Sequence, residues 1–375
     1  MRIVHLADTH LGFKQFSAMD HARGLNQREC DVYAAWHRAI EMTIELQPDA
    51  VVHAGDLFDS ARPSFRAMAE AIDGFTRLQE AGVPAIVIAG NHETPRFRSG
   101  GSVFEVLERV SIEAVWSEPR TIRVGSLALH AVPHEPHAEA LERDILGLSL
   151  DTSADANVLV MHTGLETVKS SYSEVNQVEL DPEALTRVEF DYIALGDLHR
   201  FQAPQVNAAY PGSLERLDFN DLDGEKAVLE VDLSAGAGNR EFLRRHEYVP
   251  RLLVDLQVDC TECGPDVVLA RLKGEIEGRE LDGAVARLRL EAVERDVYHA
   301  LDFDLIDHLL APCLHKILSV GRGGLRTAGA SDGSELSFEA FARASMPATV
   351  DADAVVTIAR RFLDDAAAEE AEAQA

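Results

Sequence analysis

The chain has 375 residues, of which 46% are hydrophobic and 26% charged, and its formal net charge is −29. This length and composition are typical of a globular protein that buries a full core and forms two domains, and no apolar run approaches the length of a membrane span. The charge argues against binding of nucleic acid by bulk electrostatics, because such binding depends on Lys and Arg side chains that neutralise phosphates. A protein of this charge that acts on phosphates needs local positive charge from bound metals, arginine clusters or a basic partner.

The cysteines and the N-terminus predict a cytoplasmic protein. The four cysteines, Cys30, Cys260, Cys263 and Cys313, are too few for a disulfide scaffold. Cys260 and Cys263 have the spacing of zinc ligands, but no second Cys/His pair follows at a suitable distance, so we expect two incidental thiols near the end of a strand. The strand-like segment 2–7 opens the chain without a positively charged leader, and we therefore expect no secretory signal.

The first two predicted strands both end in carboxylates. The strand over 2–7 is followed by Asp8 and His10, which lie two residues apart and can chelate one cation together. A helical pattern over 29–46 leads to the next strand, which ends at Asp56. Each of these residues alone could be a helix cap or a turn residue.

A third strand end adds an amide and an imidazole. The helical pattern over 63–80 leads to a strand over 84–89, which is followed by Asn91 and His92. In α/β proteins, ligands bind at the carboxyl ends of the strands. Three strands in succession therefore indicate one site.

Two more strand ends carry the same kinds of side chain. A hairpin over 121–132 turns at Gly125-Ser126, and the next strand ends at His162. A strand over 192–195 is then followed by Asp197 and His199. If each of these residues merely capped a turn, five coincidences would be needed, so we predict a metal site.

Other histidines and one turn give weaker signals. We expect His134 and His137, in a proline-rich loop, to be exposed, with a phosphate or substrate contact as the lesser alternative. We expect His5 and His53 to pack against the sheet. The turn over 210–216 offers hydroxyl, amide and guanidinium donors, which suit either structural support or an anion.

Changes in residue pattern and composition along the sequence predict four segments. The strands over 226–233 and 241–248 close the first domain, and a strand, helix and strand pattern then predicts a small α+β domain. A Gly/Ser-rich linker and a helical end with an acidic tail follow, and a helical pair without its own core is typical of a partner-binding segment. The predicted boundaries are 1–248, 249–320, 321–335 and 336–375.

Together, the polar strand ends predict a pair of divalent ions that hydrolyses phosphoesters. Mixed nitrogen and oxygen ligands without thiolates suit manganese, iron or zinc pairs. Asp56, in the middle of the series, can bridge two ions, and such a pair activates water for in-line attack at phosphorus. His92 is the candidate to steady the phosphate or to protonate the leaving oxygen. The predicted ligands are Asp8, His10, Asp56, Asn91, His162, Asp197 and His199.

These residues resemble motifs of a known family, the calcineurin-like metallophosphoesterases. In chain order the five motifs are Asp8-Thr9-His10, Gly55-Asp56 with Asp59, Gly90-Asn91-His92-Glu93, His162, and Gly196-Asp197-Leu198-His199. A narrower resemblance is to the SbcD-type nuclease subunit of the prokaryotic double-strand-break repair complex. It is carried by residues 6–12, 55–59, 194–200 and 210–218.

This resemblance implies a fold, two metal ions and residue roles. The implied α/β fold is a four-layer α/β/β/α sandwich with a small capping domain that grips DNA and C-terminal helices. Asp56 would bridge two manganese ions, and His92 would be the catalytic histidine. Asp197 departs from the family's Gly-His-x-His motif; its carboxylate can ligate manganese, but it adds negative charge and puts metal preference and rate in question. The implied ligands are Asp8, His10 and His199 for the first ion, and Asn91, His162 and Asp197 for the second.

The resemblance also implies partners and leaves two alternatives. The C-terminal helices would bind the coiled coil of an SbcC-type ATPase, which could supply DNA affinity, and the family pattern implies a homodimer. One alternative is a phosphodiesterase for small nucleotides, which needs neither capping domain nor partner. The other is a repair-complex scaffold in which Asp197 leaves the site weakly active.

Overall fold

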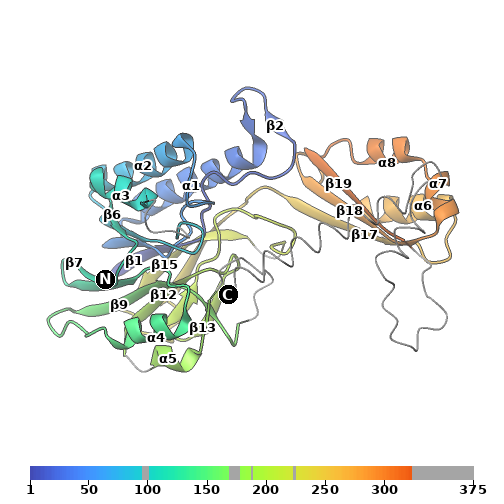
Figure 1. Cartoon of the computed structure of the whole chain (residues 1–375). Coiled ribbons are helices and arrows are strands. Elements are labelled where there is room, and N and C mark those ends of the chain that lie inside the picture. The colour runs from blue at the N-terminus through green and yellow to red at the C-terminus, as the bar shows by residue number, and fades with distance from the viewer. Residues whose placement is uncertain (95–100, 169–177, 187–188, 223–224, 323–375) are drawn as a thin grey trace, which may run out of the picture. The chain divides into compact units, whose positions relative to one another are not determined.

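Two six-stranded sheets dominate the part of the chain that the computed structural model describes (Figure 1). The described residues are 1–94, 101–168, 178–186, 189–222 and 225–322. The first sheet has the order β16 (Leu243–Tyr248), β15 (Lys226–Asp232), β1 (Arg2–Leu6), β4 (Ala50–His53), β5 (Ala85–Ile88) and β6 (Glu113–Val115). The second has the order β13 (Gln202–Gln205), β14 (Ala208–Tyr210), β12 (Tyr192–Gly196), β9 (Ala156–His162), β8 (Leu127–Val132) and β7 (Arg120–Val124).

The central strands of both sheets are parallel, as the sequence predicts. β1 pairs in parallel with β4, and β4 with β5. In the second sheet, β8 pairs in parallel with β9, and β9 with β12. The predicted hairpin is confirmed, because β7 and β8 are antiparallel and Val124 pairs with Leu127 across the turn. The strand ends that carry the predicted ligands thus belong to both sheets, with β1, β4 and β5 in one and β9 and β12 in the other.

Alternate side chains of β1 point to opposite faces of the first sheet, and this places one layer of the fold on each face. Val4 and Leu6 pack in the cluster formed with the helices, whereas Ile3 packs with residues of the second sheet. Helices cover the outer faces of both sheets, which confirms the four-layer α/β/β/α fold. They are α1 (Gln27–Leu46), α2 (Phe65–Glu80) and α3 (Val103–Arg109) on the first sheet, and α4 (Ala138–Leu146) and α5 (Pro182–Thr186) on the second.

Local signals set the helix boundaries close to those predicted. Asn26 caps α1 by accepting from the backbone of Glu29, and the helix ends at Leu46, before the capping residue Gln47, whose backbone is left-handed. Ser64 caps α2 by accepting from the backbone of Ala67. α3 and β6 were not predicted from the sequence, although Ser102 forms a capping box at the start of α3.

A small three-stranded sheet with its own core follows the sandwich. The predicted strand, helix and strand are present, and a further strand and two short helices extend them. Cys260, Cys263 and Cys313 are buried in this core and form no disulfide with one another. The elements are β17 (Leu253–Asp259), α6 (Pro265–Ile276), β18 (Val285–Val293), α7 (Arg295–Ala300), α8 (Phe303–Leu309) and β19 (His315–Arg322).

The contacts group Met1–Gly321 into one compact unit, so the predicted boundary at residue 249 stays a prediction. From residue 323 on, the predicted linker and C-terminal helical segment lie outside the described residues. The remaining elements are two-residue strands, namely β2 (Met19–Asp20), β3 (Leu25–Asn26), β10 (Gly164–Leu165) and β11 (Glu179–Leu180).

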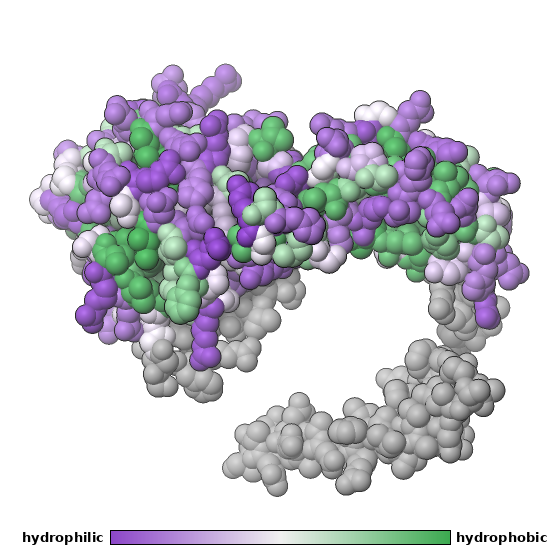
Figure 2. All heavy atoms as spheres, turned by 90° about the horizontal axis from the view of Figure 1, so that it is seen from above, coloured by the Kyte–Doolittle hydropathy of each residue, from purple (hydrophilic) through white to green (hydrophobic). Residues whose placement is uncertain are grey.

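The surface agrees with the polar composition. Figure 2 shows one face, which is mostly hydrophilic with hydrophobic side chains scattered over it. Among the helices that the structure describes, none combines the length and the apolar character that a membrane crossing requires.

Candidate metal centre

The seven predicted ligands follow five strand ends and are all buried. Each of them is at most 5% exposed. β1 leads to two of them, β4 and β5 to one each, β9 ends on one, and β12 leads to two. They are Asp8, His10, Asp56, Asn91, His162, Asp197 and His199.

Asp56 lies at the centre of the cluster. Its Oδ2 atom is 3.4 Å from His162 Nε2, 3.7 Å from His10 Nε2 and 4.0 Å from His92 Nε2. Two groups of donors with metal-like spacing share it, one with His10 and His92 and the other with Asp8 and His162. A carboxylate common to two donor groups has the placement that a bridging ligand requires.

The orientation of His162 directs one ring nitrogen to the cluster. Its Nδ1 lies 2.8 Å from the carbonyl oxygen of Ala54, so this nitrogen donates and Nε2 faces the cluster. Asp8 Oδ1 lies 3.9 Å from His162 Nδ1, the nitrogen that donates to the Ala54 carbonyl and is thus not available to a metal ion.

The side chains of Asn91 and Asp197 both lie near His162 Nε2. In the amide orientation that satisfies its neighbours, the Asn91 nitrogen donates to His162 Nε2 (2.9 Å) and Asp56 Oδ2 (3.0 Å). A metal ion would take the amide oxygen, which needs only a flip of the amide group. Asp197 Oδ1 lies 3.8 Å from His162 Nε2, and the Asp197 backbone donates to Asp8 Oδ1. The carboxylate of Asp197 thus lies beside the predicted ligands His162 and Asp8.

The backbone is strained at four of the predicted ligands. Asp8, His10 and Asp56 have φ between 51° and 53°, and Asp197 has φ of 108°. This left-handed region costs a non-glycine residue about 1–2 kcal/mol. Hydrogen bonds from the Asp8 and His10 amides to the loop after β4 hold the geometry. Such strain is concentrated at functional sites in proteins, where the surrounding structure compensates for it.

The electrostatics of the cluster fit divalent cations. Burial raises the pKa of Asp8 well above its usual value, and its Oδ2 has no hydrogen-bond partner among the described residues. Burial also opposes ionisation of Asp56, but His162, followed by His92 and His10, holds its pKa well below the usual value. His10 Nε2 faces His199 Nε2 at 3.1 Å, so one of the two must carry a proton unless both face a cation. The buried carboxylates and facing imidazoles are donors that a divalent metal ion satisfies.

His92 differs from the ligands in being accessible. Its side chain is 26% exposed, and its backbone donates to Asp56 Oδ1 at 3.0 Å. Its Nδ1 lies 2.9 Å from the carbonyl oxygen of Asp59, so Nδ1 donates and Nε2 is directed toward Asp56. His92 can therefore contact a substrate phosphate, although its Nε2 also has metal-like spacing from His10 and Asp56.

Glu93 supports the site, a role that the sequence analysis did not assign. Its carboxylate, 1% exposed, accepts from the amides of Phe58 (2.6 Å) and Gly90 (2.8 Å), and so ties the loop after β4 to the loop after β5. Burial, and then the charge of Asp56, raises its pKa to about 8. The sequence signal for this role was the position of Glu93 at the end of the motif Gly90-Asn91-His92-Glu93.

Replacement of Glu93 by alanine is expected to destabilise the protein by about 2–4 kcal/mol, because it leaves two buried amides without an acceptor. Urea unfolding measures this loss. Glu93→Gln keeps one oxygen acceptor, and we expect it to lose less stability than Glu93→Ala. Equal stability of Glu93→Ala and the wild type would contradict the assigned role.

The other histidines give one correction. The exposure expected for His134 is wrong, since it is 7% exposed: its amide donates to the carbonyl of Ala89 at the end of β5, and its Nδ1 lies 3.2 Å from Thr94 Oγ1. The packed positions of His5 and His53 are confirmed, because His5 Nδ1 contacts Tyr192 and His53 Nε2 contacts Thr9.

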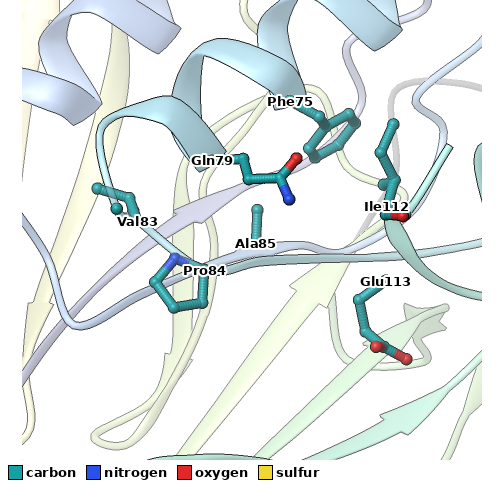
Figure 3. Close-up of a pocket in the computed structure, with 9 residues that line it drawn as sticks. Phe75, Gln79, Val83, Pro84, Ala85, Ile112 and Glu113 are labelled. Carbon is teal, nitrogen blue, oxygen red and sulfur yellow. The ribbon is translucent and has the colours of Figure 1, made fainter.

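A hollow on the surface lies away from the cluster (Figure 3). It is lined in part by Phe75, Pro84, Ala85 and Ile112. Since Ala85 begins β5, the hollow lies at the amino end of this strand, whereas Asn91 follows its carboxyl end. It is therefore not part of the metal centre.

The fold and this cluster define a metal-dependent phosphoesterase. Residues 1–201 match the family model described as calcineurin-like phosphoesterase, and the chain belongs to this family. Proteins of this family hydrolyse phosphoester bonds with divalent metal ions, which agrees with the donor set.

Several curated relatives carry the description "DNA double-strand break repair protein Mre11". The chain is 33% identical over 245 residues to that of Sulfurisphaera tokodaii, covering 62% of this chain and 60% of the relative. It is 29% identical over 294 residues to that of Haloferax volcanii, covering 77% and 61%. It is 37% identical over 243 residues to that of Methanococcus maripaludis, covering 60% of each. The chain thus spans about three fifths of the length of these relatives.

Proposed function

We propose that this chain is a manganese-dependent DNA exo/endonuclease of double-strand-break repair. The observation that carries the proposal is the placement of Asp56, which two donor groups share where five strand ends meet. The description of the relatives as double-strand break repair proteins supports DNA as the substrate. The ligands combine nitrogen and oxygen without sulfur, which suits manganese.

In this proposal each ligand has a role at two ions. The ions, when bound, would activate water and neutralise the phosphate. Asp56 would be the bridging ligand. Asp8, His10 and His199 would hold the first ion, and Asn91, His162 and Asp197 the second.

His92 would act on the substrate. The Asp59 carbonyl accepts from His92 Nδ1, and Nε2, which is directed toward Asp56, would meet a phosphate bound at the two ions. A protonated Nε2 can donate to a phosphate oxygen or to the leaving oxygen. The surrounding burial keeps bulk water from the ligands, which strengthens these interactions.

We also propose which parts of the complex let an acidic chain bind DNA. Residues 249–320 would form the capping domain, yet Arg287 and Arg289 are both paired with Asp255 there. An SbcC-type ATPase subunit, bound by 336–375, would supply the remaining positive charge. We further propose a homodimer and a cytoplasmic location; buried free thiols fit a reducing compartment.

Manganese-dependent cleavage of duplex and hairpin DNA tests the proposal. We expect His92→Ala to lower the cleavage rate by about 10²–10⁴-fold, the usual contribution of a general acid. The matched control is His137→Ala, since this histidine is largely exposed, with 78% of its side chain accessible. Its rate should equal that of the wild type.

The same assay separates the alternatives. Rapid hydrolysis of a small nucleotide phosphodiester without DNA cleavage would replace the nuclease by a small-molecule phosphodiesterase. Absence of hydrolysis of both substrates, with manganese bound, would favour a repair-complex scaffold.

A further inference from the structure

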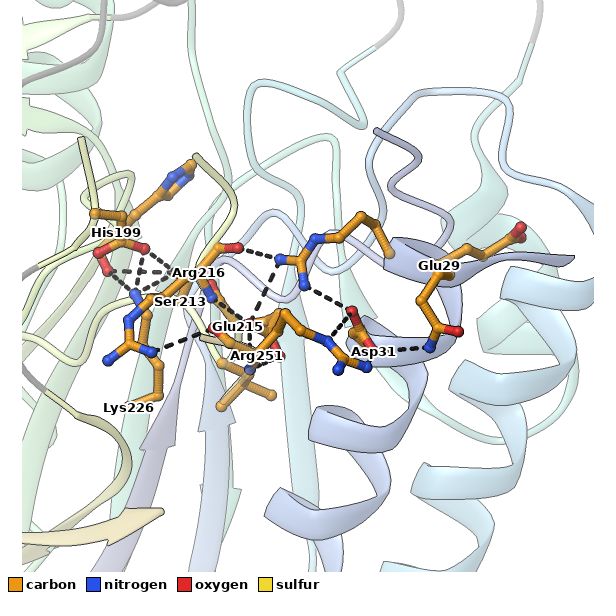
Figure 4. Close-up of polar contacts among 12 residues, drawn as sticks. Glu29, Asp31, His199, Ser213, Glu215, Arg216, Lys226 and Arg251 are labelled. Atoms are coloured by element: carbon orange, nitrogen blue, oxygen red, sulfur yellow. Dashed lines mark hydrogen bonds and ion pairs between the residues drawn. The ribbon is translucent and has the colours of Figure 1, made fainter. Parts of the chain in front are cut away.

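A buried lysine contacts the backbone of one predicted ligand. Lys226, at the start of β15, has a side chain that is 7% exposed. Its ammonium donates to the carbonyl of His199 (2.7 Å), to Ser213 Oγ (2.8 Å) and to the carboxylate of Asp221 (Figure 4). All three protons of the ammonium are thus used. A buried charge is costly unless it is paired and hydrogen-bonded, and these three partners offset that cost while tying Lys226 to the His199 carbonyl.

The turn next to Lys226 supports the same carbonyl. The Ser213 amide donates to the His199 carbonyl at 3.1 Å, and Ser213 Oγ donates to the carbonyl of Glu215 at 2.8 Å. His199 itself lies outside regular strands and helices, in the segment after β12. Its carbonyl is therefore held by these contacts and not by a sheet ladder.

Glu215 joins this turn to two other parts of the chain. Its carboxylate, 3% exposed, accepts from the Arg251 amide at 3.0 Å and lies 3.5 Å from the Arg28 guanidinium. The Arg251 side chain donates to both oxygens of Asp31 in α1, at 2.6 Å and 3.0 Å. Arg251 lies two residues before β17. A continuous polar network thus runs from His199 through the turn to α1 and to the start of the small sheet (Figure 4).

We infer that Lys226 is a positioning residue for His199, and that the turn over 213–216 extends this support to Arg251. The inference rests on the proposed two-metal function, because it assigns His199 to one ion. Metal ligands need partners that fix their orientation, and loss of such a partner typically costs about 10–100-fold in metal affinity or activity. Lys226 acts here through the backbone of the ligand.

Titration of Mn²⁺ by calorimetry and by electron paramagnetic resonance tests the inference on the full chain. We expect Lys226→Met to weaken the binding of one of the two ions by about tenfold or more, and to leave the other within about threefold. On a small phosphodiester such as bis-p-nitrophenyl phosphate, kcat should fall while KM stays unchanged, since Lys226 does not reach the site where substrate binds.

Two further variants separate positioning from stability. Glu230→Gln, on the same strand, removes a buried charge that pairs with Arg2 and His246, so it should lower the melting temperature without changing Mn²⁺ affinity. Ser213→Ala removes only a hydroxyl, and we expect it to fold and to weaken the same ion as Lys226→Met.

The outcomes distinguish the inference from the function on which it rests. Wild-type affinity for both ions in Ser213→Ala and in folded Lys226→Met would overturn the inference alone. Equal weakening of both ions by Glu230→Gln would also overturn it, because the effect would then follow from stability. A wild-type protein that binds no Mn²⁺ would overturn the proposed function, and this inference with it.

Discussion

Asp56→Asn is expected to lower phosphodiester hydrolysis by roughly 10³-fold or more at saturating Mn²⁺. The substitution keeps the shape of the side chain but removes the charge that two ions would share, and electrostatic groups at the reacting centre contribute on this scale. Its Oδ1 would also stop accepting the His92 amide if the new amide nitrogen took that position. The ligand and the group that faces the substrate would thus be affected together.

Single-turnover hydrolysis and Mn²⁺ titration measure this effect. The matched control is Asp49→Asn, at the opposite end of β4, where the exposed carboxylate accepts from the backbone of Arg2. We expect the control to keep wild-type activity. Binding of two ions with wild-type affinity by Asp56→Asn would refute the bridging role.

The strand ends of the site could be predicted because they depend on local sequence. β-branched runs followed by Gly or Ala and then by Asp or Asn indicate where a buried strand stops, and parallel strands present these ends at one edge. Asp8, Asp56 and Asn91 follow β1, β4 and β5 in this way. The two-sheet arrangement came from the family resemblance, since periodicity alone does not tell which sheet β9 and β12 join.

Contacts between distant segments could not be predicted. Glu215 meets Arg251 and Arg28, and His134 meets the end of β5, only after the sheets have packed. A buried charge such as Lys226 looks like a surface residue in the sequence, because Lys is rarely buried without a partner. The turn over 210–216 was expected to give structural support or to bind an anion, and its side chains are engaged in structural contacts.

The glycines of the motifs explain how loops from two sheets come so close. A Cβ atom on Gly55 would lie 2.3 Å from His162 Nδ1, and one on Gly90 would lie 2.1 Å from Asp56 Oδ1. On Gly196 it would lie 1.9 Å from the carbonyl oxygen of Ala54, a backbone atom. The spacing of the cluster therefore depends on the absence of side chains at these positions.

Gly196→Ala is consequently expected to destabilise the protein by about 3 kcal/mol or more and to abolish most of the activity. Overpacking typically costs about 1–3 kcal/mol, and here the clash falls on backbone that cannot rotate away. Displacement of the Ala54 carbonyl would also break its hydrogen bond with His162 Nδ1, and the ring would lose the orientation that directs Nε2 to the cluster.

Urea unfolding and Mn²⁺ titration of Gly196→Ala test both consequences. The matched control is Gly274→Ala in α6, where the added Cβ meets no atom within 4 Å and φ is not positive. Because alanine favours a helix over glycine by about 1 kcal/mol, this control should be as stable as the wild type or more so. A Gly196→Ala protein with wild-type stability and Mn²⁺ affinity would contradict the close approach of Gly196 to the Ala54 carbonyl. The shared edge on which Asp56 and His162 meet would then need to be revised.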